Sequence, residues 1–279
     1  MPELPEVETV RAGIERFVVG RLIVSVEIIK AKILRNPLVE PHEFASRLIS
    51  ARFVNARRRG KHLIFGLDNG YALYAHLNMR GQFVLVADSS VPQAKYLCIV
   101  ISLDTGSELR YHDIWTWGEL RVLKDTCEEL VKYVPALADM GPEPLSSELD
   151  GEVLKKRASS RSKSPIKVVL LDQAVVAGVG NIYADESLFR AGVNPLRKTG
   201  TLIDSEWAAL AESIKGVLTE AVASGGTLSD NYVDIEGSAG RYKPDVYGRA
   251  KLPCVQCAEP LFTARTGGRS TVYCAICQK

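Results

Sequence analysis

The sequence lacks a long apolar run, a basic leader and any internal repeat, and each absence excludes a class of protein. None of its apolar stretches approaches the roughly 18 residues that a membrane-spanning helix requires. Glu3, Glu6 and Glu8 stand where a secretory signal peptide carries positive charge. We therefore expect an intracellular, cytoplasmic protein that has no membrane partner. The 279 residues suffice for one large domain or two moderate ones with buried cores.

Net charge is also nearly absent, but the value of +2 hides a segregation of charge along the chain. Residues 52–61 and residues 155–167 are both rich in lysine and arginine and contain no acid. Acids are instead concentrated between residues 125 and 152. Basic patches on a near-neutral chain are what a groove for a polyanion needs. Solvated surface loops are the alternative interpretation of each run taken alone.

The apolar pattern changes from strands to helices partway along the chain. An amphipathic helix is predicted over residues 3–18, where Val7, Val10 and Ile14 recur at helical spacing. Hairpin turns are predicted at 68–70 and 104–106. Alternating apolar residues predict strands at 22–28, 82–87, 95–103, 108–112 and 119–123. The first half of the chain therefore predicts one helix followed by a β-sandwich or barrel.

Beyond Gly141-Pro142-Glu143-Pro144 the composition predicts a second, helical part. One helix is expected to be capped by Ser164, another to follow the turn at 177–181, and a long one to run from Asp204 to Gly225. The stretch 226–248 is rich in Gly, Ser and Asp and has no periodicity, so it predicts a long loop. Loops of this length are usually functional or disordered.

Four of the six cysteines form two Cys-x2-Cys pairs near the end of the chain. The 16 residues between the pairs give the spacing of a four-thiolate zinc site, so one structural Zn²⁺ is predicted on Cys254, Cys257, Cys274 and Cys277. Two disulfides are the alternative, which a reducing cytosol disfavours. The residues between the pairs predict a hairpin with Arg269 at its tip. An arginine there suits bidentate contact with a phosphate, the alternative being a solvated tip.

The first eight residues carry two prolines and three acids ahead of the predicted helix. Removal of Met1 would expose the secondary amine of Pro2, and an α-amino group titrates at much lower pH than a lysine. Neutral amines attack electrophilic carbons and form Schiff bases. Glu3 beside the amine suits proton transfer, and Glu6 one turn further suits positioning of the amine. An ordinary helix start is the alternative, because helix N-termini favour proline and acids.

Taken together, these features resemble formamidopyrimidine-DNA glycosylase. The shared motifs are Pro2-Glu3-Leu4-Pro5-Glu6-Val7-Glu8, Arg59-Gly60-Lys61, His76-Leu77-Asn78-Met79-Arg80-Gly81, Leu171-Asp172-Gln173, the stretch 178–186 and the four cysteines. Their order and spacing cover nearly the whole chain. Leu4 favours this branch over the related endonuclease VIII group, which usually carries Gly there.

The resemblance implies a multidomain α+β fold. We expect an N-terminal helix with a catalytic β-sandwich domain over 1–140, a helix–two-turn–helix DNA-binding domain over 141–240 and a zinc finger over 241–279. We also expect a monomer. The implied activity is excision of oxidised purines, 8-oxoguanine and formamidopyrimidines, from damaged double-stranded DNA, followed by cutting of the strand. The damaged nucleotide is flipped out of the duplex, and the loop over 226–248 covers it.

The same resemblance implies roles for individual residues. Pro2 attacks C1′ of the deoxyribose to form a Schiff base, which then undergoes β- and δ-elimination, and Glu3 is the catalytic acid and base. Lys61, Asn181 and Arg269 hold phosphates around the flipped nucleotide, and Lys61 and Arg269 assist the eliminations. The predicted catalytic set is thus Pro2, Glu3, Glu6, Lys61 and Arg269. Met79 and Trp117 are predicted to fill the gap in the duplex, and Lys167 is predicted as a further DNA contact.

The sequence departs from the family at residues 113–118. The family's Asp-Pro-Arg-Arg-Phe-Gly is here Asp-Ile-Trp-Thr-Trp-Gly. Trp117 suits the wedge role of the phenylalanine, since stacking needs only a flat apolar face. Trp115 cannot replace the hydrogen bonds of an arginine to the unpaired opposite base. We therefore predict a relaxed or altered opposite-base preference, the alternative being that both tryptophans are core aromatics.

Two other functions compete with excision of oxidised purines. One is endonuclease VIII-like excision of oxidised pyrimidines, which differs in substrate but not in chemistry. The other is a non-catalytic zinc-finger protein that binds damaged DNA. Pro2 and Glu3 argue against the second alternative, because a protein that only binds DNA needs neither a nucleophile nor a proton shuttle.

Overall fold

The computed structural model describes residues 2–34, 40–228 and 232–279, which form two compact units. Unit 1 comprises Met1–Ala138 and Gly225–Arg241, and unit 2 comprises Asp139–Ser224 and Tyr242–Lys279. Met1, whose removal the sequence predicts, and part of the predicted loop over 226–248 lie outside the described residues. The division into three domains at residues 140 and 240 stays a prediction.

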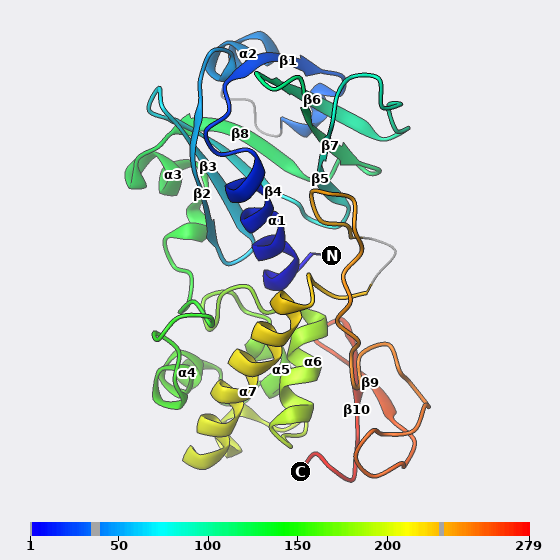
Figure 1. Cartoon of the computed structure of the whole chain (residues 1–279). Helices are drawn as coiled ribbons and strands as arrows, with labels where there is room; N and C mark the ends of the chain where they lie inside the picture. Colours follow the sequence, from blue (N-terminus) through cyan, green and yellow to red (C-terminus); the bar gives the residue numbers. More distant parts are fainter. Residues whose placement is uncertain (1, 35–39, 229–231) are drawn as a thin grey trace. The chain divides into compact units, whose positions relative to one another are not determined.

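Unit 1 is a β-sandwich preceded by the helix α1 (Leu4–Phe17) (Figure 1). One sheet has the strand order β1 (Ile23–Ile28), β6 (Leu97–Leu103), β7 (Glu108–Asp113) and β5 (Gly81–Val86). The other has the order β2 (Phe53–Arg59), β3 (His62–Leu67), β4 (Tyr71–His76) and β8 (Glu119–Lys124). Neighbouring strands in both sheets are antiparallel. The predicted helix, the sandwich and both hairpin turns are therefore confirmed.

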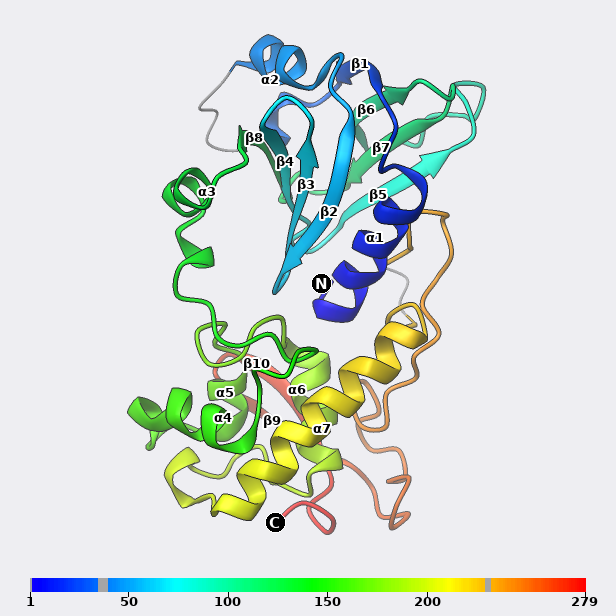
Figure 2. The ribbon, with the colours of Figure 1, turned by 60° about the vertical axis from the view of Figure 1, so that its left-hand side comes forward.

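The two sheets share one apolar core because their strands alternate between inward and outward side chains. Phe65 of one sheet and Phe83 of the other meet edge to face, with ring centroids 5.6 Å apart. Helix α1 adds its apolar stripe, including Val10 and Ile14, to the same core. Figure 2 shows α1 beside β2. Packing of this stripe fixes the helix, and so the start of the chain, against the sandwich.

The second sheet is buried on part of its other face as well. Helix α3 (Cys127–Tyr133) supplies Leu130 to a smaller cluster that contains Ile64 and Tyr74. Helix α2 (Pro41–Leu48) lies against β1 and β8. Because both faces of β3 are covered, its residues Leu63–Leu67 are all buried and lack the alternation of a half-exposed strand.

The segment Gly225–Arg241 belongs to unit 1 although it follows the last helix of unit 2 in the chain. Leu85 donates a backbone hydrogen bond to the Ile235 carbonyl at 2.6 Å, and the Ile235 side chain packs on α1. A Cβ at Gly13 of α1 would lie 2.7 Å from that side chain, so a larger residue there would force the Ile235 side chain to shift. Part of the predicted loop is thus packed against the sandwich.

Unit 2 is a small helical array that carries one β-hairpin (Figure 1). Its elements are the helices α4 (Gly151–Ala158), α5 (Ile166–Leu170), α6 (Asn181–Arg190) and α7 (Asp204–Ala223) and the strands β9 (Phe262–Thr266) and β10 (Arg269–Tyr273). Helix α7 contacts both α4 and α6, and α6 contacts α5 and β10. Ser164 does not cap α5 as predicted, because Pro165 is the N-cap residue.

Single 3-10 turns complete the described elements, at Ala31–Ile33, Pro135–Leu137, Ser159–Arg161 and Thr199–Thr201. Among the described helices, none combines the length and the apolar character needed to cross a membrane.

Candidate functional site

Glu6 ties the first turn of α1 to the segment 225–241. One oxygen of its carboxylate accepts the backbone N–H of Glu3 at 2.8 Å, and the other accepts that of Thr227 at 2.8 Å. The Tyr232 hydroxyl donates to the Glu6 carbonyl at 3.2 Å. Both carboxylate oxygens accept backbone N–H groups. This geometry suits positioning of the chain start, as predicted for Glu6, rather than proton transfer.

Gly226 lets the segment 225–241 approach Glu6 closely. Its φ of +93° lies in the region that only glycine adopts readily. A Cβ there would also lie 2.9 Å from the Tyr232 ring and 3.2 Å from Cγ of Glu6. The close approach allows the neighbouring Thr227 amide to reach the Glu6 carboxylate.

Pro2 and Glu3 immediately precede α1, and both are buried. Glu3 is the N-cap residue, with the extended backbone angles φ −108° and ψ −168°. The first turn of a helix leaves backbone N–H groups without helical partners, and these give that end a partial positive charge. The predicted nucleophile and the predicted acid–base residue therefore lie together at the positive end of one helix.

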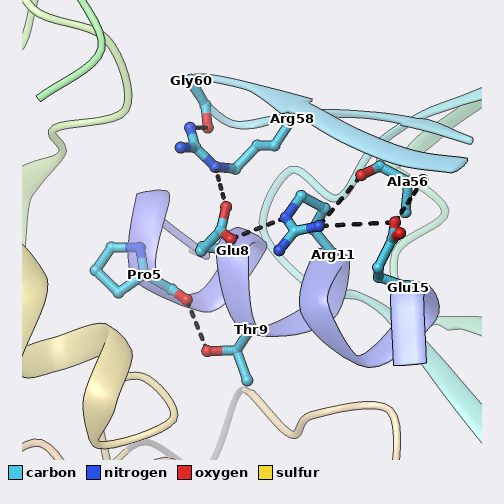
Figure 3. Close-up of polar contacts among 8 residues, drawn as sticks. All are labelled: Pro5, Glu8, Thr9, Arg11, Glu15, Ala56, Arg58 and Gly60. Carbon is cyan, nitrogen blue, oxygen red and sulfur yellow. Dashed lines mark hydrogen bonds and ion pairs between the residues drawn. The ribbon is translucent and has the colours of Figure 1, made fainter. Parts of the chain in front are cut away.

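Lys61 lies in the tight turn between β2 and β3. Gly60, before it, has a φ of +54°. Arg58 donates from Nη1 to the Gly60 carbonyl at 2.9 Å and from Nε to the Glu8 carboxylate of α1 at 2.8 Å (Figure 3). Arg11 donates to the second oxygen of Glu8 at 2.8 Å. One carboxylate thus links the helix that begins after Pro2 with the turn that carries Lys61.

Two neutral histidines lie next to Lys61, and only one of them belongs to a motif noticed in the sequence. The rings of His62 and His76 have centroids 4.7 Å apart. Burial is the main cause that lowers the pKa of His62 to about 3 and that of His76 to about 4, and the nearby Lys61 charge contributes to both shifts. His62 Nδ1 lies 2.8 Å from the Tyr74 hydroxyl, and His76 Nδ1 accepts the Asn78 amide at 3.3 Å. Both rings remain uncharged at neutral pH and add no charge beside the lysine.

Met79 and Trp117 lie on two loops of unit 1 that are hydrogen-bonded to each other. The Asn78 side chain donates to the Trp117 carbonyl at 2.6 Å. Trp117 is 48% exposed and Trp115 is 40% exposed. The two tryptophans are therefore surface residues, and the alternative that they are core aromatics is wrong.

Asn181 is the first residue of α6 and follows a turn fixed by Gln173. The Gln173 side chain accepts the Gly178 N–H at 2.8 Å and donates to the Val179 carbonyl at 2.9 Å. Gly178 has a φ of +79°. The buried Oδ1 of Asn181 makes no hydrogen bond within the described residues. The turn presents an amide side chain at a helix start, a position that suits contact with a phosphate.

Arg269 is the first residue of β10 and is exposed. It follows the turn glycines Gly267 and Gly268, whose φ angles of +54° and +73° allow the tight reversal between β9 and β10. The hairpin predicted between the cysteine pairs is confirmed, with Arg269 directly beside its tip. No carboxylate pairs with Arg269 in the part of the chain that the structure describes.

Lys167 is fully buried, and its known contacts are with the protein itself. Its ammonium lies 2.7 Å from the Asp185 carboxylate and donates to the Ser270 carbonyl at 2.8 Å. Asp185 in turn accepts the Val272 N–H at 3.1 Å. Burial raises the pKa of Asp185 to about 6, and Lys167 opposes the rise. This geometry holds the hairpin next to Arg269, and the DNA contact predicted for Lys167 stays a prediction.

Glu186, which the sequence had placed only within a motif, holds the connection from unit 2's helices to the hairpin. Its carboxylate accepts the backbone N–H groups of Asp245, Val246 and Tyr247 at 2.7–2.9 Å. Burial raises the pKa of Glu186, and the three hydrogen bonds oppose the rise. These partners could not be predicted from the sequence, because a loop has no periodic pattern that would indicate which side chain binds its backbone.

The four cysteines come together as predicted. The Sγ atoms of Cys254, Cys257, Cys274 and Cys277 all lie within 4.8 Å of one another. Cys254 and Cys277 are 3.9 Å apart at sulfur, and Cys257 and Cys274 are 3.5 Å apart. Sulfurs around a tetrahedral zinc are separated by about 3.8 Å, given Zn–S bonds of about 2.3 Å. The cluster can therefore hold one metal ion.

The basic runs are partly neutralised by acids from elsewhere in the chain. In the first run Arg57 pairs with Asp125, and Arg58 pairs with Glu8 at 2.8 Å. In the second, Arg161 pairs with Asp172. These ion pairs connect residues that are distant in sequence. The two runs therefore contain fewer unpaired basic side chains than their composition suggests.

The sequence matches two family models. Residues 1–120 match the formamidopyrimidine-DNA glycosylase N-terminal domain, and residues 140–232 match the formamidopyrimidine-DNA glycosylase H2TH domain. Formamidopyrimidine-DNA glycosylase of Geobacillus kaustophilus is 42% identical over 281 residues, with 100% of both chains covered. That of Bacillus subtilis is 39% identical over 280 residues, with 100% of this chain and 99% of the relative covered.

Solved structures extend the similarity to three dimensions. Lactococcus lactis Fpg in complex with DNA containing an abasic site has a TM-score of 0.89 at 30% identity, with 99% of each chain covered. MutM (Fpg) from Thermus thermophilus has a TM-score of 0.86 at 36% identity, with 99% of this chain and 98% of the other covered. The similarity therefore includes the sandwich, the helices and the cysteine hairpin.

Proposed function

The chain belongs to the formamidopyrimidine-DNA glycosylase family, and on that premise we propose that it is a bifunctional base-excision-repair enzyme. It removes oxidised purines, 8-oxoguanine and formamidopyrimidines, from damaged double-stranded DNA and then cuts the strand at the abasic site. The amine of Pro2, exposed by loss of Met1, is its nucleophile. The observation that carries the proposal is the full-length family match combined with Pro2 at the start of a helix that Glu6 holds in place.

The surroundings of Pro2 support its role as a nucleophile. An amine attacks only in its neutral form, and the partial positive charge at the start of a helix disfavours a further positive charge there. Glu6 binds the Glu3 amide at 2.8 Å, which restricts the conformations open to the two residues before α1. A restricted amine loses less entropy when it meets the sugar carbon.

The proposed reaction proceeds in four bond-breaking steps. The Pro2 nitrogen forms a bond to C1′ and the glycosidic bond breaks. The leaving base takes the electron pair of that bond and the proton that the Pro2 nitrogen gives up. Opening of the sugar ring, with Glu3 supplying the proton to the ring oxygen, gives an iminium between Pro2 and C1′. Loss of a C2′ proton then expels the 3′ phosphate, and a second proton loss expels the 5′ phosphate. The positively charged iminium accepts the electrons released in both eliminations.

Three polar side chains on tight turns support phosphate binding around the flipped nucleotide. Lys61 follows Gly60, Asn181 follows Gly180 and Arg269 follows Gly268. Turns bring side chains close to a ligand backbone, and cations or amides on them form charge-assisted hydrogen bonds with phosphate oxygens. We propose that Lys61 and Arg269 also stabilise the phosphate groups as they leave.

We further propose that the metal held by the four cysteines is zinc. Four thiolates at tetrahedral spacing form a closed coordination shell, which suits a structural ion and leaves no position for substrate. The zinc would hold together a hairpin whose apolar cluster is small, and it would take no part in the chemistry. The proposed substrate also implies that the protein works where chromosomal DNA is found.

Borohydride trapping tests the nucleophile directly. The protein, with its N-terminus shown by mass spectrometry to be Pro2, is incubated with duplex DNA that contains an abasic site and is reduced with borohydride. We expect a covalent adduct whose peptide map places the DNA on Pro2. A chain with one extra residue before Pro2 is the control, because its proline nitrogen is acylated and should form no adduct. An adduct on a lysine, or none with Pro2 confirmed, would overturn the proposal.

A lesion panel then tests the substrate. Duplexes carrying 8-oxoguanine, a formamidopyrimidine or an oxidised pyrimidine are compared under single-turnover conditions. Faster release of the two purine lesions supports the proposal. Faster release of the pyrimidine would favour the endonuclease VIII-like alternative, and binding without any release or adduct would favour the non-catalytic alternative.

A further inference from the structure

Two exposed tryptophans form a pair on the loop that follows β7. Trp115 and Trp117 are 40% and 48% exposed, and their ring centroids lie 4.9 Å apart with an angle of 45° between the planes. Ile114, next to them, is 42% exposed. Large apolar side chains grouped at a surface are unfavourable in water, and such groups usually mark a binding site. The pair is therefore a candidate binding surface.

The loop that carries the pair has a fixed shape. The fully buried Asp113 accepts the Trp115 N–H at 2.9 Å and the Gly118 N–H at 2.6 Å. Thr116 between the two tryptophans has a φ of +53°. A Cβ at Gly118 would lie 1.9 Å from the Tyr111 hydroxyl, so the loop closes tightly on that buried ring. The tryptophans are thus presented by a preorganised loop.

A second loop, before β5, is joined to the first. Asn78 donates from its side chain to the Trp117 carbonyl at 2.6 Å. Gly81 packs on the same Tyr111 hydroxyl, where a Cβ would lie only 2.1 Å away. Met79 and Arg80, between Asn78 and Gly81, are therefore held beside the tryptophan pair.

Arg80 is drawn onto Trp115 by a cation–π interaction. Its guanidinium carbon lies 5.1 Å from the centroid of the indole. No carboxylate pairs with Arg80 anywhere in the described ranges, whereas Arg110 of the same sheet is paired with Glu108 at 2.7 Å. A guanidinium has five N–H donors in a planar fork, and stacking on an aromatic face leaves those donors available at its edge.

We propose that Arg80 is a specificity-determining residue that reads the unpaired base opposite the excised lesion. This inference rests on the proposed function. Trp115 and Trp117 stack on the bases exposed when the damaged nucleotide leaves the duplex, since stacking tolerates any base. The guanidinium edge donates two hydrogen bonds to that base.

The donors of Arg80 select the base by its pairing edge. Cytosine presents two adjacent acceptors there, N3 and O2, which match the fork of a guanidinium. Adenine presents one acceptor beside a donor, and guanine presents one acceptor beside two donors. A bidentate contact typically discriminates by about tenfold or more against a base that cannot form it. This proposal differs from the relaxed preference predicted from the absence of an arginine at position 115, because an arginine from the neighbouring loop lies over Trp115.

The test compares excision of 8-oxoguanine from duplexes with C, A, G or T opposite, in single turnovers. For the unaltered protein we expect excision opposite C to be about tenfold faster than opposite A. Arg80→Ala should bring the rate opposite C down to the rate opposite A. The rate opposite A should fall less than the rate opposite C, because adenine does not form the two hydrogen bonds that the substitution removes.

Arg16→Ala is the matched control. Arg16 also stacks on an aromatic ring, with its guanidinium 4.6 Å from the Phe17 centroid, but it lies at the far end of α1 from the chain start. It should leave the C-to-A ratio unchanged. Arg80→Lys keeps the charge without the planar fork and should retain less than half of the preference, which separates hydrogen bonding from charge.

Three results separate the possible failures. An unchanged C-to-A ratio in a folded Arg80→Ala protein would overturn the role of Arg80 and leave the proposed function intact. Equal rates opposite all four bases in the unaltered protein would do the same. If Arg80→Ala does not fold, Arg80→Lys is used instead, and a C-to-A ratio that stays at that of the unaltered protein would overturn the role of Arg80. Absence of excision opposite every base, together with absence of a borohydride adduct, would instead reject the proposed function.

Discussion

The Lys167 ammonium lies 2.7 Å from the Asp185 carboxylate, and neither side chain is exposed to solvent. Both partners also bind the backbone of β10, Lys167 through the Ser270 carbonyl and Asp185 through the Val272 N–H. Gly267 at the hairpin tip packs on α5, the short helix that carries Lys167, since a Cβ there would lie 2.9 Å from the Val168 side chain. Buried charges of this kind fix geometry because an unpaired partner is strongly disfavoured.

Asp185→Asn should therefore destabilise the protein strongly. The substitution keeps the size of the side chain but leaves the Lys167 charge buried without a counter-charge, which costs about 3–5 kcal/mol. The free energy of unfolding in urea measures the effect. Asp204→Asn is the control, because it breaks the exposed Lys155–Asp204 pair, and such pairs contribute about 0–1 kcal/mol. An equal decrease in the free energy of unfolding in the two variants would show that the buried pair contributes no more to stability than the exposed one.

Glu6→Gln should disturb the start of the chain. The amide of glutamine presents an NH₂ group to one of the two backbone N–H groups that the carboxylate now accepts, from Glu3 and Thr227. Leaving one of them unsatisfied costs about 1–3 kcal/mol of stability. We expect slower formation of the borohydride adduct, measured alongside unfolding. Glu15→Gln on the same helix is the control, because Glu15 accepts one backbone N–H, that of Ala56, and glutamine can still accept it. Undiminished adduct formation in Glu6→Gln would remove Glu6 from the positioning of Pro2.

The protein should lose stability as the pH falls from about 6.5 towards 4. In the fold His62 and His76 have pKa values of about 3 and about 4, against 6.5 for an ordinary histidine. At these two residues the unfolded chain binds more protons than the folded one within this window, so their protonation favours unfolding. Asp185, whose pKa is raised to about 6, opposes them with at most one proton. Each histidine should contribute a loss of up to about 2 kcal/mol between pH 6.5 and pH 5, at 1.36 kcal/mol per pH unit.

His62→Gln isolates one of the two groups. The slope of the unfolding free energy against pH, between pH 6.5 and 5, should fall by about one proton. The exposed His42 on α2 is the control, and His42→Gln should leave the slope unchanged. If His62→Gln also keeps the slope of the unaltered protein, the acid sensitivity comes from other groups.

Local features of the fold were predictable from the sequence. Helix α1 carries its apolar stripe at helical spacing, and the β3–β4 hairpin turns at Asp68-Asn69-Gly70, so each is specified by neighbouring residues. The β9–β10 hairpin follows likewise from Gly267-Gly268 and the flanking apolar residues. Helices α2, α3 and α4 were not predicted individually, because segments of 7–8 residues offer too few repeats for a clear period.

Partners that are distant in the chain were not predictable. The basic run predicts a DNA contact for Lys167, but no pattern in the sequence identifies its partner Asp185 on the next helix. The Thr227 amide bound by Glu6 is 221 residues away. Arg80 lies in a shared motif, but the sequence assigns it no role, since its position on Trp115 depends on two loops that meet only in the folded sandwich. Sequence reasoning reached the site through motifs, and the structure adds the groups that hold those motifs.

Loss of the metal should unfold the cysteine hairpin and leave unit 1 folded. Its apolar cluster is small and includes two of the cysteines themselves, Cys254 and Cys274, whereas zinc binding by such sites contributes about 10–16 kcal/mol near pH 7. We expect one zinc per chain by elemental analysis and none in Cys254→Ser. Trypsin should then cut the hairpin at Arg265 and Arg269 while the sandwich resists digestion. Cys127→Ser is the control, because Cys127 is exposed and lies outside the cluster. Full zinc content in Cys254→Ser, or a hairpin that resists trypsin without metal, would mean that the apolar contacts alone hold the module.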